Sequence, residues 1–149
     1  MSTVPAICKA MVPVLQTLPG LTVAYPKPDR ITRSPTAVIL WGAATQPTTI
    51  DHTSGVEMWT ALVSVQVLVD HRDATPTEVE RIYDLITPIA DLFSVGVYQD
   101  GPAPLDGLCD RCLMVAVEPE WLVPYGNQWC YGANLTFEIQ FTRVPGVTP

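Results

Sequence analysis

The stretch from Trp59 to Phe93 changes the spacing of its apolar residues partway along, and this change most constrains the fold. Its first part reads W-T-A-L-V-S-V-Q-V-L-V-D, with apolar residues at every second position from Ala61 to Val69. A period of two is typical of a strand with one buried face. From Val79 to Phe93 the apolar residues recur every three or four positions, which is typical of an amphipathic helix. The chain must therefore combine a sheet with helices.

The helix that follows the long strand has clear start signals. Thr75 is the expected N-cap, Pro76 takes the first helical position, and Glu78 stands three residues after the cap, as in a capping box. Pro88 is expected to bend the last turns. The apolar stripe of this helix is expected to contain Val79, Ile82, Tyr83, Ile86, Ile89, Ala90 and Phe93.

The remaining elements follow from the same two periods and from breaks rich in proline and glycine. We expect a helix over 3–18, although Pro13 is unfavourable inside it. Pro119 is expected to end a strand, and the aromatic segment 121–132 is expected to be irregular. The expected strands cover 21–25, 36–41, 112–117 and 135–144, the expected loops cover 26–35 and 42–55, and residues 145–149 form a C-terminal tail.

These elements predict an α+β fold with a single mixed or antiparallel β-sheet and two helices packed on one face. The order is helix, two short strands, a long strand, helix and two strands, or α-β-β-β-α-β-β. A chain of 149 residues is long enough for one domain and too short for two comfortable ones, so residues 1–149 are expected to form a single domain.

The charge is acidic and unevenly distributed. The net charge is −7, but residues 1–50 carry two lysines and two arginines against one aspartate, or +3. Residues 51–149 carry four arginines against fourteen acids, or −10. A protein that grips DNA needs basic residues to replace the counterions on the phosphates, so this balance argues against DNA binding. It is compatible with a protein that DNA slides past.

The first twenty residues lack the pattern of a signal peptide, and no apolar run reaches the ~20 residues that a membrane helix needs. We therefore expect no membrane partner and a cytosolic origin, where cysteines stay reduced. Charged residues make up only 15% of the chain, against about 25% in a typical soluble domain. This shortage favours burial of part of the surface by a partner, although a surface rich in Thr and Pro also explains it.

The cysteines include one close pair, Cys109-Asp-Arg-Cys112. A redox pair would be expected to open a helix, whereas this one precedes a strand. A zinc site would need two further ligands, and Cys130, His52 and His71 are the candidates, but none forms a second close pair. Structural cysteines are the favoured interpretation, so no metal and no cofactor are expected.

Other chemical sites find little support. His52 and His71 each stand next to an aspartate, but no nucleophile elbow or oxyanion loop accompanies Ser54 or Ser64. No glycine-rich phosphate loop is present. The four tryptophans lack the interleaved basic residues of a single-stranded nucleic acid site, so packing is the favoured role for them. No catalytic residue is expected.

The order of elements resembles that of the tail terminator proteins of long-tailed (siphovirus) bacteriophages. The resemblance covers about residues 4–144. It rests on a helix, the strand with V-x-V-x-V-x-V-D, the proline-capped helix and the final strand L-T-F-E-I-Q-F-T. Proteins of that family form a hexameric ring that caps the tail tube, ends its polymerisation and provides the surface for head–tail joining. The resemblance carries over no individual functional residues.

The resemblance implies a structural virion protein and not an enzyme. It would be assembled in the host cytoplasm and located in the tail or neck. Its partners would be copies of itself, the tail tube protein and the head–tail connector (stopper) protein, and the genome would pass through the ring without specific binding. The alternatives are another neck or tail component, such as a connector or tube protein, and a small cysteine-based metal-binding domain. The candidate interface residues are Lys27, Arg30, Arg33, Thr48, Ile50, Trp121 and Trp129.

Overall fold

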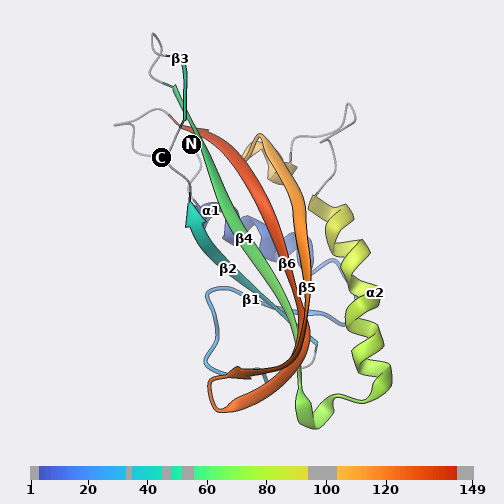
Figure 1. Ribbon diagram of the computed structural model, residues 1–149. Coiled ribbons are helices and arrows are strands. Elements are labelled where there is room, and N and C mark those ends of the chain that lie inside the picture. The colour runs from blue at the N-terminus through green and yellow to red at the C-terminus, as the bar shows by residue number, and fades with distance from the viewer. Residues whose placement is uncertain (1–3, 33–34, 45–47, 52–55, 94–103, 144–149) are drawn as a thin grey trace.

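The computed structural model describes residues 4–32, 35–44, 48–51, 56–93 and 104–143. It has an α+β fold, as predicted, with two α-helices and a six-stranded mixed sheet (Figure 1). The helices are α1 (Val4–Leu15) and α2 (Pro76–Phe93). The strands are β1 (Thr22–Ala24), β2 (Thr36–Ala44), β3 (Thr48–Asp51), β4 (Val56–Asp70), β5 (Arg111–Tyr125) and β6 (Gln128–Arg143), and two short 3-10 turns cover His71–Asp73 and Pro104–Gly107.

The sheet runs in the order β1-β2-β4-β6-β5, and β3 pairs with the first residues of β4. Among the described strands, β1 and β2 form the one parallel pair. The central pair, β4 and β6, keeps an unbroken antiparallel register from Glu57↔Arg143 to Asp70↔Cys130. This pairing places the two alternating apolar rows predicted from the sequence on the same face.

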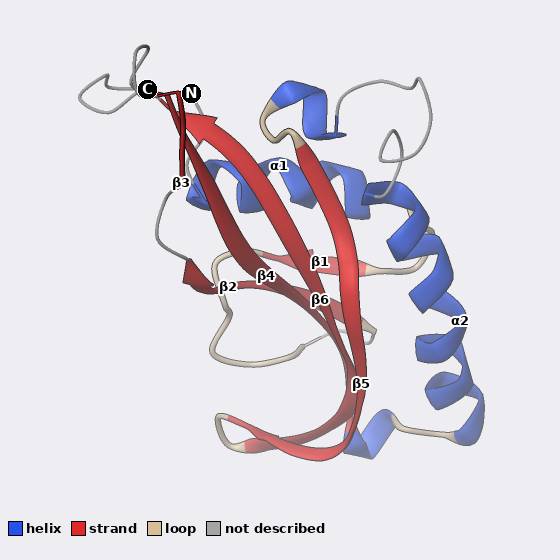
Figure 2. Ribbon diagram, turned by 45° about the horizontal axis from the view of Figure 1, so that its top comes forward, coloured by secondary structure: helices blue, strands red, loops and turns tan. Residues whose placement is uncertain are grey.

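The main core lies between that face and both helices (Figure 2). The alternating residues of β4 are all buried, and Phe137 of β6 meets Phe93 of α2 edge-on, with the ring centroids 5.3 Å apart. The helices therefore cover one face of the sheet, as predicted. Buried members of this core include Ile7, Met11, Leu15, Ala61, Val63, Val65, Val67, Val69, Ile82, Ile89, Leu135, Phe137, Ile139 and Phe141.

A second, smaller core lies on the opposite face, at the end of the sheet where the β5–β6 hairpin curls away from α2 (Figures 1 and 2). It contains Ile31, Val38, Leu68, Tyr125 and Cys130, all buried. Loop residues 26–32 thus pack on the sheet through Ile31. The alternation of β4 alone did not indicate this core, because Leu68 stands at a position that the alternation assigns to the solvent side.

The helices differ from their predicted form in detail. The N-cap of α2 is confirmed, because the Thr75 hydroxyl accepts a hydrogen bond of 3.3 Å from the Glu78 amide. Tyr83 was wrongly placed in the apolar stripe, since 38% of it is exposed. The first helix ends at Leu15 and not at residue 18. Pro13 lies exposed in the last turn of α1 and, having no N–H, cannot donate to the Lys9 carbonyl; the helix ends two residues later.

Three predictions about strands were wrong. Pro119 does not end a strand, because β5 continues through it to Tyr125. Since β5 is an edge strand, a residue without an N–H group can sit there without breaking the ladder. Segment 121–132 is not irregular but contains a hairpin. Gly126 supplies the positive φ of 58° at the start of the two-residue turn between Tyr125 and Gln128.

The third error concerns loop 42–55, much of which is strand. β2 extends to Ala44, and Thr48–Asp51 form β3 against Val56–Met58. The β-branched residues Thr48, Thr49 and Ile50 favour this conformation. Loop 26–35 contains no helix or strand in its described part. Residues 45–47 and 52–55 of the other loop and the predicted tail lie outside the described residues.

Gly132 provides a test of how closely β6 approaches β4. A Cβ atom built at this position would clash with the Val67 carbonyl oxygen, whereas one at Gly107 would meet nothing within 4 Å. We expect Gly132→Ala to lower the free energy of unfolding by about 3 kcal/mol or more, because two central strands must separate. Urea denaturation measures this loss.

Gly107→Ala is the matched control. Gly107 has a φ of 85°, so alanine there meets backbone strain of about 1–2 kcal/mol without a steric clash. A loss at Gly132 no greater than the loss at Gly107 would contradict the close approach.

Candidate functional site

The candidate site is a cleft at the end of the sheet that carries the second core. Loop 26–32, the turn after β4 and the β5–β6 hairpin meet there. The cleft has a volume of about 450 Å³ and is lined by Asp29, Arg30, Asp70, His71, Arg72, Asn127, Gln128 and Trp129. We call it the hairpin cleft.

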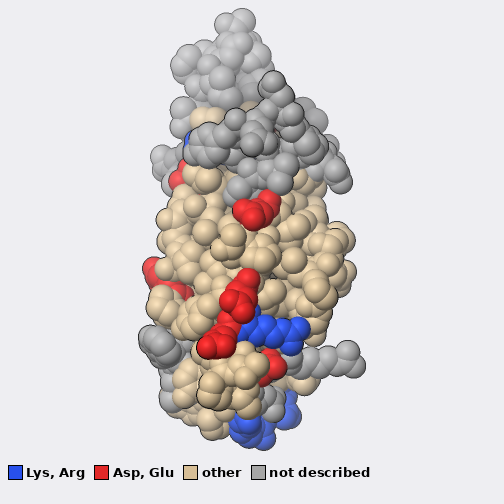
Figure 3. All heavy atoms as spheres, turned by 90° about the vertical axis from the view of Figure 1, so that its right-hand side faces the viewer, with Lys and Arg blue, Asp and Glu red and all other residues tan. Residues whose placement is uncertain are grey.

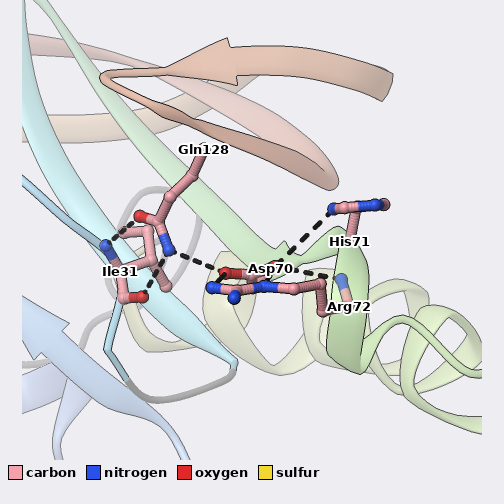
Figure 4. A network of polar contacts seen from close by, with 5 residues as sticks. All are labelled: Ile31, Asp70, His71, Arg72 and Gln128. Carbon is pink, nitrogen blue, oxygen red and sulfur yellow. Dashed lines mark hydrogen bonds and ion pairs between the residues drawn. The ribbon is translucent and has the colours of Figure 1, made fainter.

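Asp70 stands at the centre of the polar contacts in the cleft (Figure 4). It is the last residue of β4 and only 5% exposed. Its Oδ1 accepts a hydrogen bond of 2.9 Å from the Arg72 amide, and its Oδ2 lies 3.2 Å from an Arg72 guanidinium nitrogen. The same Oδ2 accepts a hydrogen bond of 2.7 Å from the Gln128 amide group. A buried carboxylate is thus fully provided with donors.

These contacts determine the charge of Asp70. The hydrogen bonds from Arg72, first from its side chain and then from its backbone, lower the pKa of Asp70 from 3.8 to about 2, against the opposing effect of burial. Asp70 is therefore a carboxylate at neutral pH. Cys130, the register partner of Asp70, has its pKa raised to about 11 by burial and by the Asp70 charge, so its thiol stays protonated.

Gln128 joins loop 26–32 to the sheet. Its Oε1 accepts a hydrogen bond of 2.7 Å from the Ile31 amide, and its Nε2 donates one of 2.9 Å to the Ile31 carbonyl. The same Nε2 reaches Asp70, so one side chain holds the loop, the hairpin and the end of β4 together (Figure 4).

A second set of contacts joins the same loop to the hairpin. The Tyr125 hydroxyl donates to the Pro28 carbonyl, and Lys27 Nζ lies 4.8 Å above the Tyr125 ring, in cation–π contact. Residues 27–31 are therefore attached to the hairpin by several side chains. A loop held in this way is ordered before any partner arrives, which lowers the entropy cost of binding.

Two of the predicted interface residues line the hairpin cleft, and a third lies beside it. Arg30 and Trp129 line it, with Trp129 50% exposed, and Lys27 is exposed beside it. Arg33 lies outside the described residues. Thr48 and Ile50 belong to β3 and Trp121 to β5, but their side chains lie outside the described part of the structure. The sequence did not indicate Gln128, nor that Asp70 would be bound by it, because this contact joins residues 58 positions apart.

The zinc candidates are not brought together. Cys109 and Cys112 belong to the main core under the helices, whereas Cys130 belongs to the second core on the opposite face of the sheet. Burial raises the pKa of Cys109 to about 11 and that of Cys112 to about 12. No group of three metal-ligating side chains occurs within the described residues, which exclude His52.

The described arrangement offers His71 no nucleophile. Its Nδ1 lies 3.8 Å from Asp70 Oδ1, but the residues that line the cleft include no Ser, Thr, Cys or Lys. Ser64 lies six positions before Asp70 on β4, which corresponds to about 20 Å at the rise of a strand. The cleft is suited to binding rather than catalysis. Its floor is the ion pair between Asp70 and Arg72, and its rim carries Asp29, Arg30, His71 and Asn127 beside the ring of Trp129.

Comparison with known families gives no match, since no protein-family model fits this chain. No curated protein matches it either. None of the described helices is long and apolar enough to cross a membrane.

The pKa of Asp70 predicts how stability depends on pH. Because the folded pKa is about 2 and the ordinary value is 3.8, the Asp70 carboxylate stabilises the fold above about pH 4. This contribution, about 2 kcal/mol, is lost as the pH falls toward 2. In Arg72→Met the folded pKa should move back toward or above the ordinary value. The variant should be less stable at pH 7 and should lose the Asp70 part of the acid transition. Urea denaturation from pH 2 to 7 checks this.

Arg81→Met is the control for that experiment. Arg81 makes an exposed contact of 3.9 Å with Glu78, so its removal should change stability by less than about 0.5 kcal/mol at any pH. If Arg72→Met retained the acid dependence of the unchanged protein, the assignment to Asp70 would be wrong.

The link through Gln128 can be tested at a single amide. Gln128→Ala removes the acceptor of the Ile31 N–H, so exchange of the Ile31 amide should accelerate at least tenfold, equivalent to about 1.4 kcal/mol. Hydrogen exchange followed by NMR measures this directly. Gln140→Ala is the control. It makes the same change on β6 but away from loop 26–32, and it should leave the exchange rate of the Ile31 amide unchanged. Equal exchange in the two variants would contradict the link.

Proposed function

We propose that this protein is a structural virion protein that forms a ring on the end of a bacteriophage tail tube. The ring ends polymerisation of the tube and provides the surface for head–tail joining. The observation that carries the proposal is that the sheet is open at both edges among the described residues, and that the open edges carry exposed apolar side chains.

One open edge is β5, which is 15 residues long and pairs only with β6 in the described structure. Val115 and Val117 on this strand are 48% and 39% exposed. The other is the later part of β2, because the short β1 covers only Thr36–Val38. Trp41, 55% exposed, lies in that uncovered part. Edges of this kind are sites where other chains add, and proteins that remain monomeric usually protect them.

The two edges differ in sequence and length, so a contact between them is head-to-tail. Such a contact generates a closed ring when each copy is rotated by a fixed fraction of a turn, and a filament when the rotation does not close. One sixth of a turn gives the hexamer that the tail terminator resemblance implies. The resemblance was drawn from the order of elements, and the structure has that order with β3 added.

The remaining partners follow from the same resemblance. The tail tube protein would contact one side of the ring and the head–tail connector the other, with loops 26–35 and 42–55 as docking elements. The acidic balance of residues 51–149 supports a channel that DNA crosses without specific binding, since phosphates are repelled by acids. The protein would be located in the tail or neck of the virion after assembly in the host cytoplasm.

The mass of the protein in solution tests the proposal. A hexamer of 16.3 kDa subunits has a mass of about 98 kDa, and light scattering of the pure protein or of its mixture with tail tubes should show this species. Added protein should also stop the lengthening of tubes in electron micrographs. Long polymers of the protein alone would instead indicate a tube component, and a strict monomer under both conditions would contradict the ring.

A charge introduced on the open edge of β5 tests whether the subunits associate through this edge. Val117→Lys places an ammonium group on the open edge of β5 and should weaken self-association at least tenfold. Leu62→Lys introduces the same charge at a residue that is 37% exposed but lies on the central strand β4, and it should have a smaller effect. An equal effect of both changes would argue against an edge contact.

A further inference from the structure

We propose that the hairpin cleft of one copy receives the acidic face of α2 of the next copy. This inference rests on the proposed ring and names a contact that would hold its subunits in register.

Among its described lining residues, the cleft presents donors beside a single exposed carboxylate, Asp29, because its buried carboxylate, Asp70, is already occupied. Both oxygens of Asp70 are bound by Arg72 and Gln128. Arg30 and Asn127 are exposed at the rim, and the side chain of His71 is 51% exposed. Asp29 and Asp70 balance Arg30 and Arg72 in formal charge, and Lys27 adds a positive charge beside the cleft. Arginine and amide donors beside the ring of Trp129 suit a carboxylate carried on an apolar stem.

The acids on α2 have the opposite character. Glu80, Asp84 and Asp91 are exposed and spaced by four and seven residues, so they share one face of the helix. Figure 3 shows acidic side chains along the side of the molecule where α2 lies, with a basic side chain next to some of them. Within the described residues, the ion pair found on α2 joins Arg81 to Glu78, which is not one of these three acids. Like charges four residues apart, such as Glu80 and Asp84, destabilise a helix by about 0.2–0.5 kcal/mol. A cationic partner would offset this repulsion.

The two surfaces face different sides of the molecule. The β5–β6 hairpin and loop 26–32 lie on one side of the lower end of the sheet in Figure 1, and α2 lies on the other. A cleft on one copy can therefore meet α2 of the next without either surface meeting its own copy. The contact is head-to-tail, as is a contact between the unlike edges of the sheet. Because stable interfaces bury about 800 Å² per partner, the cleft adds register and specificity to a larger contact.

Charge exchange across the contact is the test. Arg30→Glu should weaken self-association at least tenfold, measured by light scattering on dilution at low salt, where surface charges are least screened. Lys9→Glu on the exposed side of α1 makes the same change of charge away from the cleft and is the control. Circular dichroism should show that both variants keep their fold.

The decisive arm combines Arg30→Glu in turn with Glu80→Lys, Asp84→Lys and Asp91→Lys. At least one combination should recover most of the association that its single variants lose, because the exchanged charges attract each other. Purely additive losses in all three combinations would overturn the inference, as would an Arg30→Glu variant that behaves like Lys9→Glu.

The outcomes separate this contact from the proposed function. A ring that forms normally with Arg30→Glu leaves the proposed function standing and removes the cleft contact. Loss of binding to tail tubes without loss of self-association would place another protein in the cleft and would also overturn the inference. Unchanged protein that never associates with itself would remove both.

Discussion

The antiparallel pairing of β4 with β6 is the interaction on which the rest of the structure depends. Its register places the alternating apolar rows of the two strands on one face, where α1 and α2 cover them. The same register ends with Asp70 opposite Cys130, next to the hairpin. A slip of one residue would place the apolar rows of the two strands on opposite faces and shift Asp70 away from Gln128. The core and the hairpin cleft are therefore consequences of one pairing.

The sequence predicted those parts of the fold that are determined locally. The alternation of β4, the cap at Thr75 and the apolar spacing of α2 each follow from neighbouring residues, and together they determine the fold class. The errors occurred where position in the sheet overrides local preference. Pro119 is tolerated because β5 is an edge strand, and the turn after Tyr125 depends on the Gly126-Asn127 pair, a hairpin signal whose significance was missed.

The cleft was less accessible to prediction, because its contacts join distant parts of the chain. Gln128 reaches Ile31 across 97 residues and Asp70 across 58. Nothing in the local sequence distinguishes Gln128 from a solvent-exposed glutamine. Arg30 and Trp129 could be named as interface candidates from residue type and loop position alone. That they line one cleft follows from the second core, which holds loop 26–32 against the hairpin.

The polar contacts at the floor of the cleft also hold loop 26–32 against the sheet. A loop without helix or strand gains little from its own backbone, and a docking loop that is mobile loses entropy when it binds. Here Gln128 satisfies both backbone groups of Ile31, while the Ile31 side chain is buried beneath. Since both oxygens of Asp70 are bound by Arg72 and Gln128, the free donors of Arg30 and Asn127 at the rim face only one exposed carboxylate among the described residues that line the cleft, Asp29. An ordered, donor-bearing rim on an acidic chain favours a contact with the acids of another copy over contact with DNA.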